Sequence, residues 1–563
     1  MVFSSFPFLL GFLPLMLLGF YCLRYCKQDF LAKVFLVLGS LFFYAFWNPS
    51  YLFLLLGSIG VNFIIGKKIL NTFAVMPSRV SLSIERGGGQ NNLLVESLSP
   101  TNNSFSLSNP NPLNPTSSKT PTNPKCFLIL GIVFNLALLG FFKYTDFFLE
   151  NFNAFSKILS LDFNIPLPHI LLPLAISFFT FQQIAFLVDC YKRIDTQDLQ
   201  EEGKALNFLD YCLFVCFFPQ LIAGPIVHHK EMMPQFHTLF AKGFDSKVWE
   251  RGAKGIFIFS LGLFKKVVIA DSFAKWANAG FAVVEQGGNL NIFESWATSL
   301  SYTFQLYFDF SGYCDMAIGL GLFFGIMLPI NFDSPYKSLN ISEFWRKWHI
   351  TLGRFLKDYL YIPLGGNQNK KYQDSKSYAI LNKIFTLRNL FIVAFLSGIW
   401  HGAGFGFILW GSLHGLAMCV HRIYGFILER FQLQSARFLK SKVYQVLCWF
   451  VTFNFLNCTW IFFRSENVQG AINLLKGMFG IVWVELPQKI RLPKLLANID
   501  GRNDTLIYII LAFIVCLCFS NSLKRLERFS PNLWNAILTG VFFYYSLIML
   551  ASTPYTEFIY FNF

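Results

Sequence analysis

Long runs of apolar residues recur along the chain, and many approach the ~20 residues that cross a lipid bilayer as a helix. In total, 54% of the residues are hydrophobic and 14% are charged, whereas soluble proteins carry about 25% charged residues. Spanning segments must satisfy their own backbone hydrogen bonds. The sequence therefore predicts an all-α polytopic membrane protein with about 11–13 transmembrane or re-entrant helices. The runs are Pro7–Leu23, Phe30–Trp47, Tyr51–Gly66, Cys126–Phe142, Pro173–Cys190, Gly255–Ala270, Leu387–Trp400, Ile408–His421, Val443–Phe463, Leu506–Phe519 and Leu533–Leu550.

The formal net charge of +15 fits a membrane protein better than a nucleic-acid-binding one. Cytoplasmic loops of membrane proteins are enriched in Lys and Arg. Basic residues follow the first and third apolar runs and precede the last one, which predicts that both ends of the chain lie outside the cytoplasm. The basic loop after Arg464 fits this scheme poorly. The residues that set the scheme are Arg24, Lys27, Lys33, Lys67, Lys68, Lys524, Arg525 and Arg528.

Residues 77–125 lack the membrane pattern, because they are rich in Ser, Asn, Pro and Thr. Such a segment cannot bury enough apolar surface to fold alone. We expect a disordered polar loop, either a tether or a tolerated insertion. It separates N-terminal transmembrane helices in residues 1–76 from a transmembrane core in residues 126–550. An aromatic tail, residues 551–563, follows the core.

A histidine at membrane depth is the first candidate for chemistry. His401 lies in a strongly apolar stretch with Gly398, Gly402, Gly404 and Gly406 around it. Ionisable residues inside a membrane are functional candidates, and glycines allow backbone or substrate to approach closely. A buried neutral imidazole is a suitable general base. The alternative is a structural histidine that is hydrogen-bonded to a neighbour.

His349 is a second candidate, which would orient the donor or the acceptor. The spacing of apolar residues predicts an amphipathic helix over residues 345–361, with His349 on its inward face. His414 follows His401 by 13 residues. On one continuous helix this separation is roughly 20 Å, so we expect a structural role for His414.

Two further clusters leave function and structure open. Asp309 and Asp315 lie in a largely apolar run and must be paired or hydrogen-bonded, for structure or for catalysis. Gly224-Pro225 predicts a turn or re-entrant segment, and His228, His229 and Lys230 follow it.

Taken together, these segments resemble the membrane-bound O-acyltransferases, in particular the bacterial branch that acts on cell-envelope polymers such as alginate, peptidoglycan and teichoic acid. The resemblance covers nearly the whole chain outside residues 77–125. Cys314 departs from it where Ser or Thr is usual, and His228 departs where Arg is usual. The matching segments are 173–182, 223–226, 309–315, 344–349, 358–366, 400–402 and 460–464.

The resemblance implies transmembrane helices around a central funnel or tunnel, with His401 as the catalytic histidine and His349 as the second polar position. It implies acetyl transfer from a cytosolic thioester, acetyl-CoA or an acyl carrier protein, across the inner membrane to a polysaccharide. Peptidoglycan is the leading acceptor, and an alginate-like or other exopolysaccharide is the alternative. A proton-coupled transporter or channel is the alternative of a different class. No bound cofactor and no nucleic-acid partner are expected.

Family members of this kind work with a periplasmic SGNH-hydrolase-like acetyltransferase that bears a Gly-Asp-Ser motif. This chain contains no Gly-Asp-Ser, so we expect it to need such a partner. The aromatic tail adds Tyr560 as a candidate. The tail is either an aromatic anchor at the membrane interface or, by resemblance to a motif of the D-alanylation machinery, the carrier of an acyl-accepting tyrosine. As a carrier, Tyr560 would be deprotonated by His401.

Overall fold

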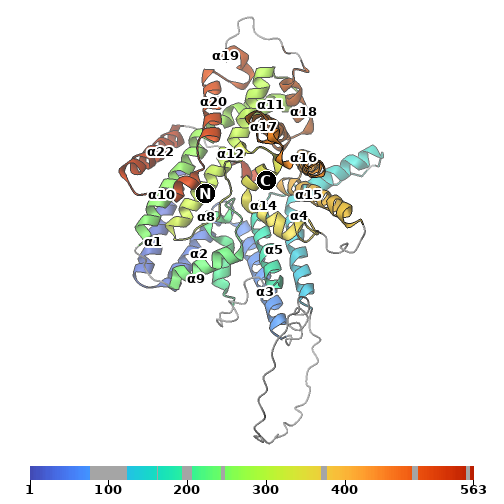
Figure 1. Cartoon of the computed structure of the whole chain (residues 1–563). Coiled ribbons are helices and arrows are strands. Elements are labelled where there is room, and N and C mark those ends of the chain that lie inside the picture. Colours follow the sequence, from blue (N-terminus) through green and yellow to red (C-terminus); the bar gives the residue numbers. More distant parts are fainter. Residues whose placement is uncertain are drawn as a thin grey trace, which may run out of the picture.

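The computed structural model describes residues 1–75, 123–161, 163–192, 206–241, 247–368, 377–482, 484, 492–552 and 558–562 (Figure 1). Every regular element in these ranges is helical, and one isolated β-bridge joins Phe332 and Trp348. The all-α class expected from the sequence is therefore confirmed. The α-helices are α1 Leu13–Tyr25, α2 Asp29–Ala45, α3 Ser50–Val75, α4 Pro124–Ile158, α5 Ile176–Lys192, α7 Phe208–Cys216, α8 Phe218–Leu221, α9 His229–Ala241, α10 Val248–Phe264, α11 Asp271–Glu285, α12 Ile292–Phe323, α13 Ile341–Lys347, α14 Ile350–Leu356, α15 Tyr378–His401, α16 Phe405–Arg430, α17 Lys442–Arg464, α18 Val468–Met478, α19 Leu492–Leu495, α20 Asn503–Cys518, α21 Ser522–Glu527 and α22 Leu533–Ser552. The π and 3₁₀ helices are η1 Pro7–Phe12, η2 Lys265–Ala270, η3 Pro335–Lys337, η4 Lys357–Tyr361, η6 Leu433–Ser435, η7 Arg437–Lys440, η8 Ala497–Ile499 and η9 Ile559–Asn562.

Within the described residues, six helical segments are long and apolar enough to cross a membrane. The other predicted apolar runs lie on α2, α5, α10 with η2, α16 and the shorter α20. The chain is thus a multi-pass membrane protein. The six segments are Pro7–Tyr25, Ser50–Thr72, Pro124–Ile158, Tyr378–His401, Lys442–Arg464 and Leu533–Ser552.

The predicted polar loop over residues 77–125 falls almost wholly outside the described residues, which resume at Asn123. Helix α4 begins at Pro124, with the Asn123 side chain accepting a hydrogen bond from the Lys125 backbone N–H. An Asn at this position satisfies a free donor of the first helical turn. The helix therefore begins two residues before the boundary expected from composition.

Helix α12 is buried along nearly its whole length and lies near the middle of the helix assembly (Figure 1). It packs closely on α10 through glycines. A Cβ atom on Gly262 would lie 2.5 Å from the Gly312 carbonyl oxygen, and one on Gly319 would lie 2.7 Å from the Gly255 carbonyl oxygen. Small residues let two helices approach in this way inside a membrane. The contact sets η2, at the end of α10, against the carboxylates of α12.

Helices α15 and α16 form a hairpin, because extended backbone at Gly402 and Gly404 separates them. Gly398 and Gly411 lie at their contact, where a Cβ atom on Gly398 would be 2.4 Å from the Phe407 carbonyl oxygen. The assumption of one continuous helix through His401 and His414 was therefore wrong.

The segment predicted as one amphipathic helix, residues 345–361, is instead divided into α13, α14 and η4. His349 lies between α13 and α14 with a left-handed backbone, φ 46°. The Ile350 backbone N–H donates to the Asn331 carbonyl oxygen at 3.0 Å, and the Phe332–Trp348 bridge lies beside it. The break arises because the backbone here pairs with residues 331–332. The inward position predicted for His349 is confirmed, since the residue is 1% exposed.

Candidate active site

The three residues predicted for the site meet in the structure. The ring centroid of Tyr560 lies 6.1 Å from that of His401 and 6.3 Å from that of His349. All three side chains are buried. Residues from the end of α15, the α13–α14 turn and η9 therefore form one cluster.

His401 is the last residue of α15 and lies among aromatic rings. The centroids of Trp400, Trp410 and Phe463 are 4.8, 5.2 and 5.1 Å from its own. Its Nδ1 atom is buried and makes no hydrogen bond to the described residues. A charged imidazole would be unfavourable in such surroundings, so the ring is held neutral and can accept a proton.

Helix α4 holds the end of the helix that carries His401. The Lys143 ammonium donates to the carbonyl oxygens of Trp400 at 2.5 Å and His401 at 3.0 Å. The Tyr144 hydroxyl donates to the Ile399 carbonyl oxygen at 2.6 Å. These carbonyls have no partner within α15, so the donors of α4 satisfy acceptors at the helix end that would otherwise be unpaired. Neither residue was selected from the sequence, although a lysine inside a long apolar helix is itself a signal of function.

His349 is fixed in one tautomer by Asn331. The Asn331 Oδ1 atom accepts from the Thr351 backbone N–H at 3.1 Å and from the Thr351 hydroxyl at 2.8 Å. The same oxygen lies 3.2 Å from His349 Nδ1, which must therefore donate. The buried Nε2 atom then carries a lone pair and makes no hydrogen bond to the described residues. His349 lies outside the candidate membrane spans, and burial lowers its pKa to about 3, so it is neutral at pH 7.

The two positions that depart from the family pattern have defined contacts. The Asn331 amide donates to the Cys314 sulfur at 3.4 Å, so Cys314 serves as an acceptor. His228 Nδ1 lies 3.1 Å from the hydroxyl of Tyr359.

The structure separates the roles of the two α12 carboxylates. Asp315 pairs with Lys265 at 2.6 Å. Asp309 pairs with Lys266 at 2.8 Å and also accepts a hydrogen bond from the tail, from the Ile559 backbone N–H at 2.9 Å.

His414 lies closer to the site than a continuous helix would allow. Trp410 separates it from His401, with centroid distances of 4.7 Å to His414 and 5.2 Å to His401. Its Nδ1 accepts from the Trp345 indole at 3.2 Å, and its Nε2 lies 3.1 Å from the Thr459 hydroxyl. Both nitrogens are occupied, which fits a structural role.

The tail folds back into the protein. Tyr560 lies 4.1 Å from Phe310 between ring centroids, and Phe558 stacks on Tyr313 at 4.6 Å. Phe3 stacks on the same Tyr313 at 4.8 Å. Figure 1 accordingly marks both ends of the chain near the centre of the molecule.

Comparisons with known proteins give a consistent picture. A family model described as "MBOAT, membrane-bound O-acyltransferase family" matches residues 190–463. The chain is 41% identical to a peptidoglycan O-acetyltransferase of Helicobacter pylori, over 100% of the chain and 98% of that relative. It is 35% identical to a probable alginate O-acetylase AlgI of Pseudomonas aeruginosa, over 92% of the chain and 82% of the relative. A teichoic acid D-alanyltransferase of Bacillus subtilis is 27% identical, over 46% of the chain and 61% of the relative.

Proposed function

Because the chain belongs to the membrane-bound O-acyltransferase family and is an O-acetyltransferase, we propose that it moves acetyl groups across the inner membrane for O-acetylation of peptidoglycan. The family and the relatives support membrane-bound O-acetylation of a cell-envelope polysaccharide. Peptidoglycan is favoured over an alginate-like polymer because the peptidoglycan relative is 41% identical to the chain, whereas the alginate O-acetylase relatives are 32–35% identical. The observation that carries the mechanism is the meeting of His401, His349 and Tyr560 in one buried cluster.

We propose Tyr560 as the residue that receives the acetyl group. His401 takes the phenolic proton as the phenolic oxygen attacks the thioester carbonyl of the cytosolic donor. The oxygen–carbon bond forms, the carbon–sulfur bond breaks, and the proton passes from His401 to the departing thiolate. The product is an acetyl ester of Tyr560. Such a covalent intermediate divides one difficult transfer into two easier ones.

The second half-reaction would use the partner. A serine hydroxyl of a periplasmic SGNH-hydrolase-like transferase attacks the acetyl carbonyl, and the Tyr560 phenoxide leaves and takes up the proton. The partner then passes the acetyl group to the polysaccharide. His349, with its lone pair on Nε2, would orient the hydroxyl that approaches His401. Acetyl-CoA is the proposed donor, and an acyl carrier protein would serve the same chemistry.

The test is Tyr560→Phe, which keeps the ring and removes only the hydroxyl. A strain that lacks the gene is complemented with each variant, and O-acetyl groups on isolated peptidoglycan and on exopolysaccharide are measured by mass spectrometry. Tyr560→Phe should reduce acetylation to the level of the deletion strain at normal protein level. Acetate should disappear from peptidoglycan and not from exopolysaccharide.

Tyr211→Phe is the matched control. This tyrosine is also buried, and its hydroxyl has no partner among the described residues. Its loss should leave acetylation unchanged. Full acetylation in Tyr560→Phe would reduce the tail to an anchor.

A further inference from the structure

We propose that Asp309 is the positioning residue for the tail: its carboxylate holds the backbone of Ile559 and thereby places Tyr560 beside His401. The inference rests on the proposed function for its effect on activity. The placement itself can be tested without any activity.

The carboxylate of Asp309 connects the tail to the charge network of the core. Asp309 Oδ2 accepts from the Ile559 backbone N–H at 2.9 Å, across 250 positions of the chain. Asp309 Oδ1 lies 2.8 Å from the Lys266 ammonium, which also pairs with Asp271 at 2.8 Å. Asp309 and Lys266 are 1% and 4% exposed. Hydrogen bonds to a charged acceptor are stronger than neutral ones, and a buried carboxylate remains charged when it is paired.

The hydrogen bond sets the register of the tail against α12. Residues 309, 310 and 313 share one face of the helix, because positions one turn apart lie above one another. Phe310 contacts the Tyr560 ring at 4.1 Å and the His349 ring at 4.8 Å. A shift of the tail along α12 would therefore move Tyr560 away from both histidines.

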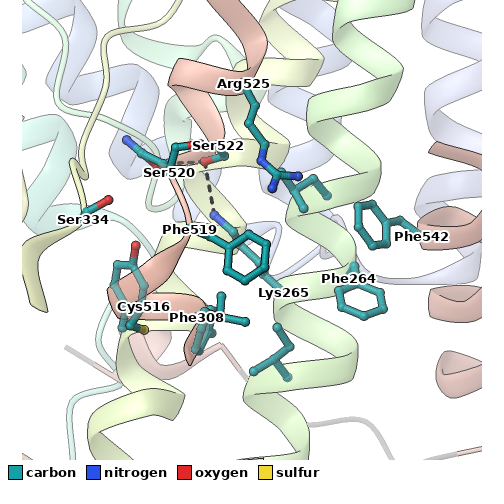
Figure 2. A pocket seen from close by; sticks show the side chains of 15 residues that line it. Phe264, Lys265, Phe308, Ser334, Cys516, Phe519, Ser520, Ser522, Arg525 and Phe542 are labelled. Atoms are coloured by element: carbon teal, nitrogen blue, oxygen red, sulfur yellow. Dashed lines mark hydrogen bonds between the residues drawn. The ribbon is translucent and has the colours of Figure 1, made fainter. Parts of the chain in front are cut away.

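The same helix provides a control of matched chemistry. Lys265, beside Lys266 in η2, pairs with Asp315 at 2.6 Å. The Ser522 hydroxyl donates to the other oxygen of Asp315 at 2.9 Å. The same hydroxyl lies 3.2 Å from the Lys265 ammonium. Ser522 and Lys265 line a pocket between α10, α20, α21 and α22 (Figure 2). Both aspartates are thus buried on α12 and paired with adjacent lysines, but the partner of the second Asp315 oxygen comes from α21 instead of the tail.

The experiment uses the full chain, purified in detergent, with Asp309→Leu, Asp309→Asn, Asp315→Leu and Asp315→Asn. Hydrogen–deuterium exchange of the C-terminal peptide reports the placement of the tail. Asp309→Leu should increase exchange of this peptide by about tenfold or more, because the charged acceptor is lost. Asp309→Asn keeps a weaker acceptor and should give a smaller increase. In both Asp315 variants, exchange of the C-terminal peptide should equal that of the wild type.

Polysaccharide acetylation in cells supplies the second readout. Asp309→Leu should lower acetylation at least as much as Asp309→Asn.

The proposal is overturned if tail exchange in Asp309→Leu equals the wild type, or rises equally in Asp315→Leu. If Asp309→Leu does not yield folded protein, exchange of the tail peptide is compared between Asp309→Asn and Asp315→Asn. The proposal is then overturned if Asp309→Asn equals the wild type or if exchange rises equally in Asp315→Asn. Full activity of Tyr560→Phe together with a loosened tail in Asp309→Leu would overturn the relay and leave the placement standing.

Discussion

The two sides of the site are held in different ways. His401 belongs to a helical hairpin whose glycines bring α15 and α16 into backbone contact, and α4 caps the carbonyls beside it. Tyr560 belongs to a short tail that contacts α12 through a backbone hydrogen bond to Asp309 and through the rings of Phe310 and Tyr313. The proposed base is thus part of the core, whereas the proposed acetyl acceptor is docked onto it. This division suits a relay, since the base must stay fixed and the loaded acceptor must meet a partner.

Among changes on the core side, His401→Ala should lower acetylation the most. His401→Ala removes the proposed general base, and such a base typically contributes about 10²–10⁴-fold, so O-acetylation of peptidoglycan should fall by that factor at normal protein level. Mass spectrometry of isolated peptidoglycan measures it. His414→Gln is the control, because His414 is buried in the same hairpin with both nitrogens occupied. It should retain most of the activity per folded protein. Near-normal acetate content in His401→Ala would end the assignment of the base.

A smaller loss of acetylation is expected from changing Lys143, which holds the helix end that carries His401. Lys143→Met leaves the carbonyl oxygens of Trp400 and His401 without their donor. An unsatisfied buried acceptor costs about 1–3 kcal/mol, so we expect acetylation to fall by about tenfold and the melting temperature to decrease.

Lys143→Arg keeps a hydrogen-bond donor at this position and should recover part of both losses. Wild-type activity and melting temperature in Lys143→Met would show that the rigidity of the His401 side has another source.

The smallest effect on acetylation should come from residues 77–122, which contribute no residue to the proposed site. Replacing residues 77–122 with a short flexible linker leaves the Asn123 cap of α4 in place. Exposed polar segments of this composition tolerate shortening. Acetylation should therefore stay near the wild-type level in the same assay. A stable but inactive deletion would assign the segment a function.

Composition and periodicity were sufficient for the all-α membrane class and for the apolar runs. His401 and His349 could be selected because an ionisable group in an apolar stretch is unfavourable unless it is used. Helix α12 was not among the predicted spans, because it faces protein instead of lipid and carries polar residues such as Thr303, Asp309 and Asp315. Hydropathy detects helices that face lipid. Helix α12 is surrounded by protein, so its polar residues lower its hydropathy.

The remaining errors concern contacts between distant segments. The break at His349 follows from pairing with residues 331–332, and the turn after His401 follows from the extended Gly402–Gly404 backbone. Local periodicity contains no information on either partner. Lys143 could have been selected from the sequence, because it is an ionisable residue in an apolar segment, as His401 is. Its hydrogen bonds to the end of α15 could not have been predicted from the sequence.

The adjacent ion pairs between η2 and α12 also bear on how the chain enters the bilayer. Delivered alone, a helix with Asp or Lys at its centre is disfavoured by roughly 2.5–3.5 kcal/mol per residue on insertion scales. Lys265 with Asp315 and Lys266 with Asp309 neutralise one another only when both segments are present. We therefore expect residues 248–323 to leave the insertion machinery as one unit. The carboxylate that holds the tail in the finished protein would then take part in biogenesis long before the tail arrives.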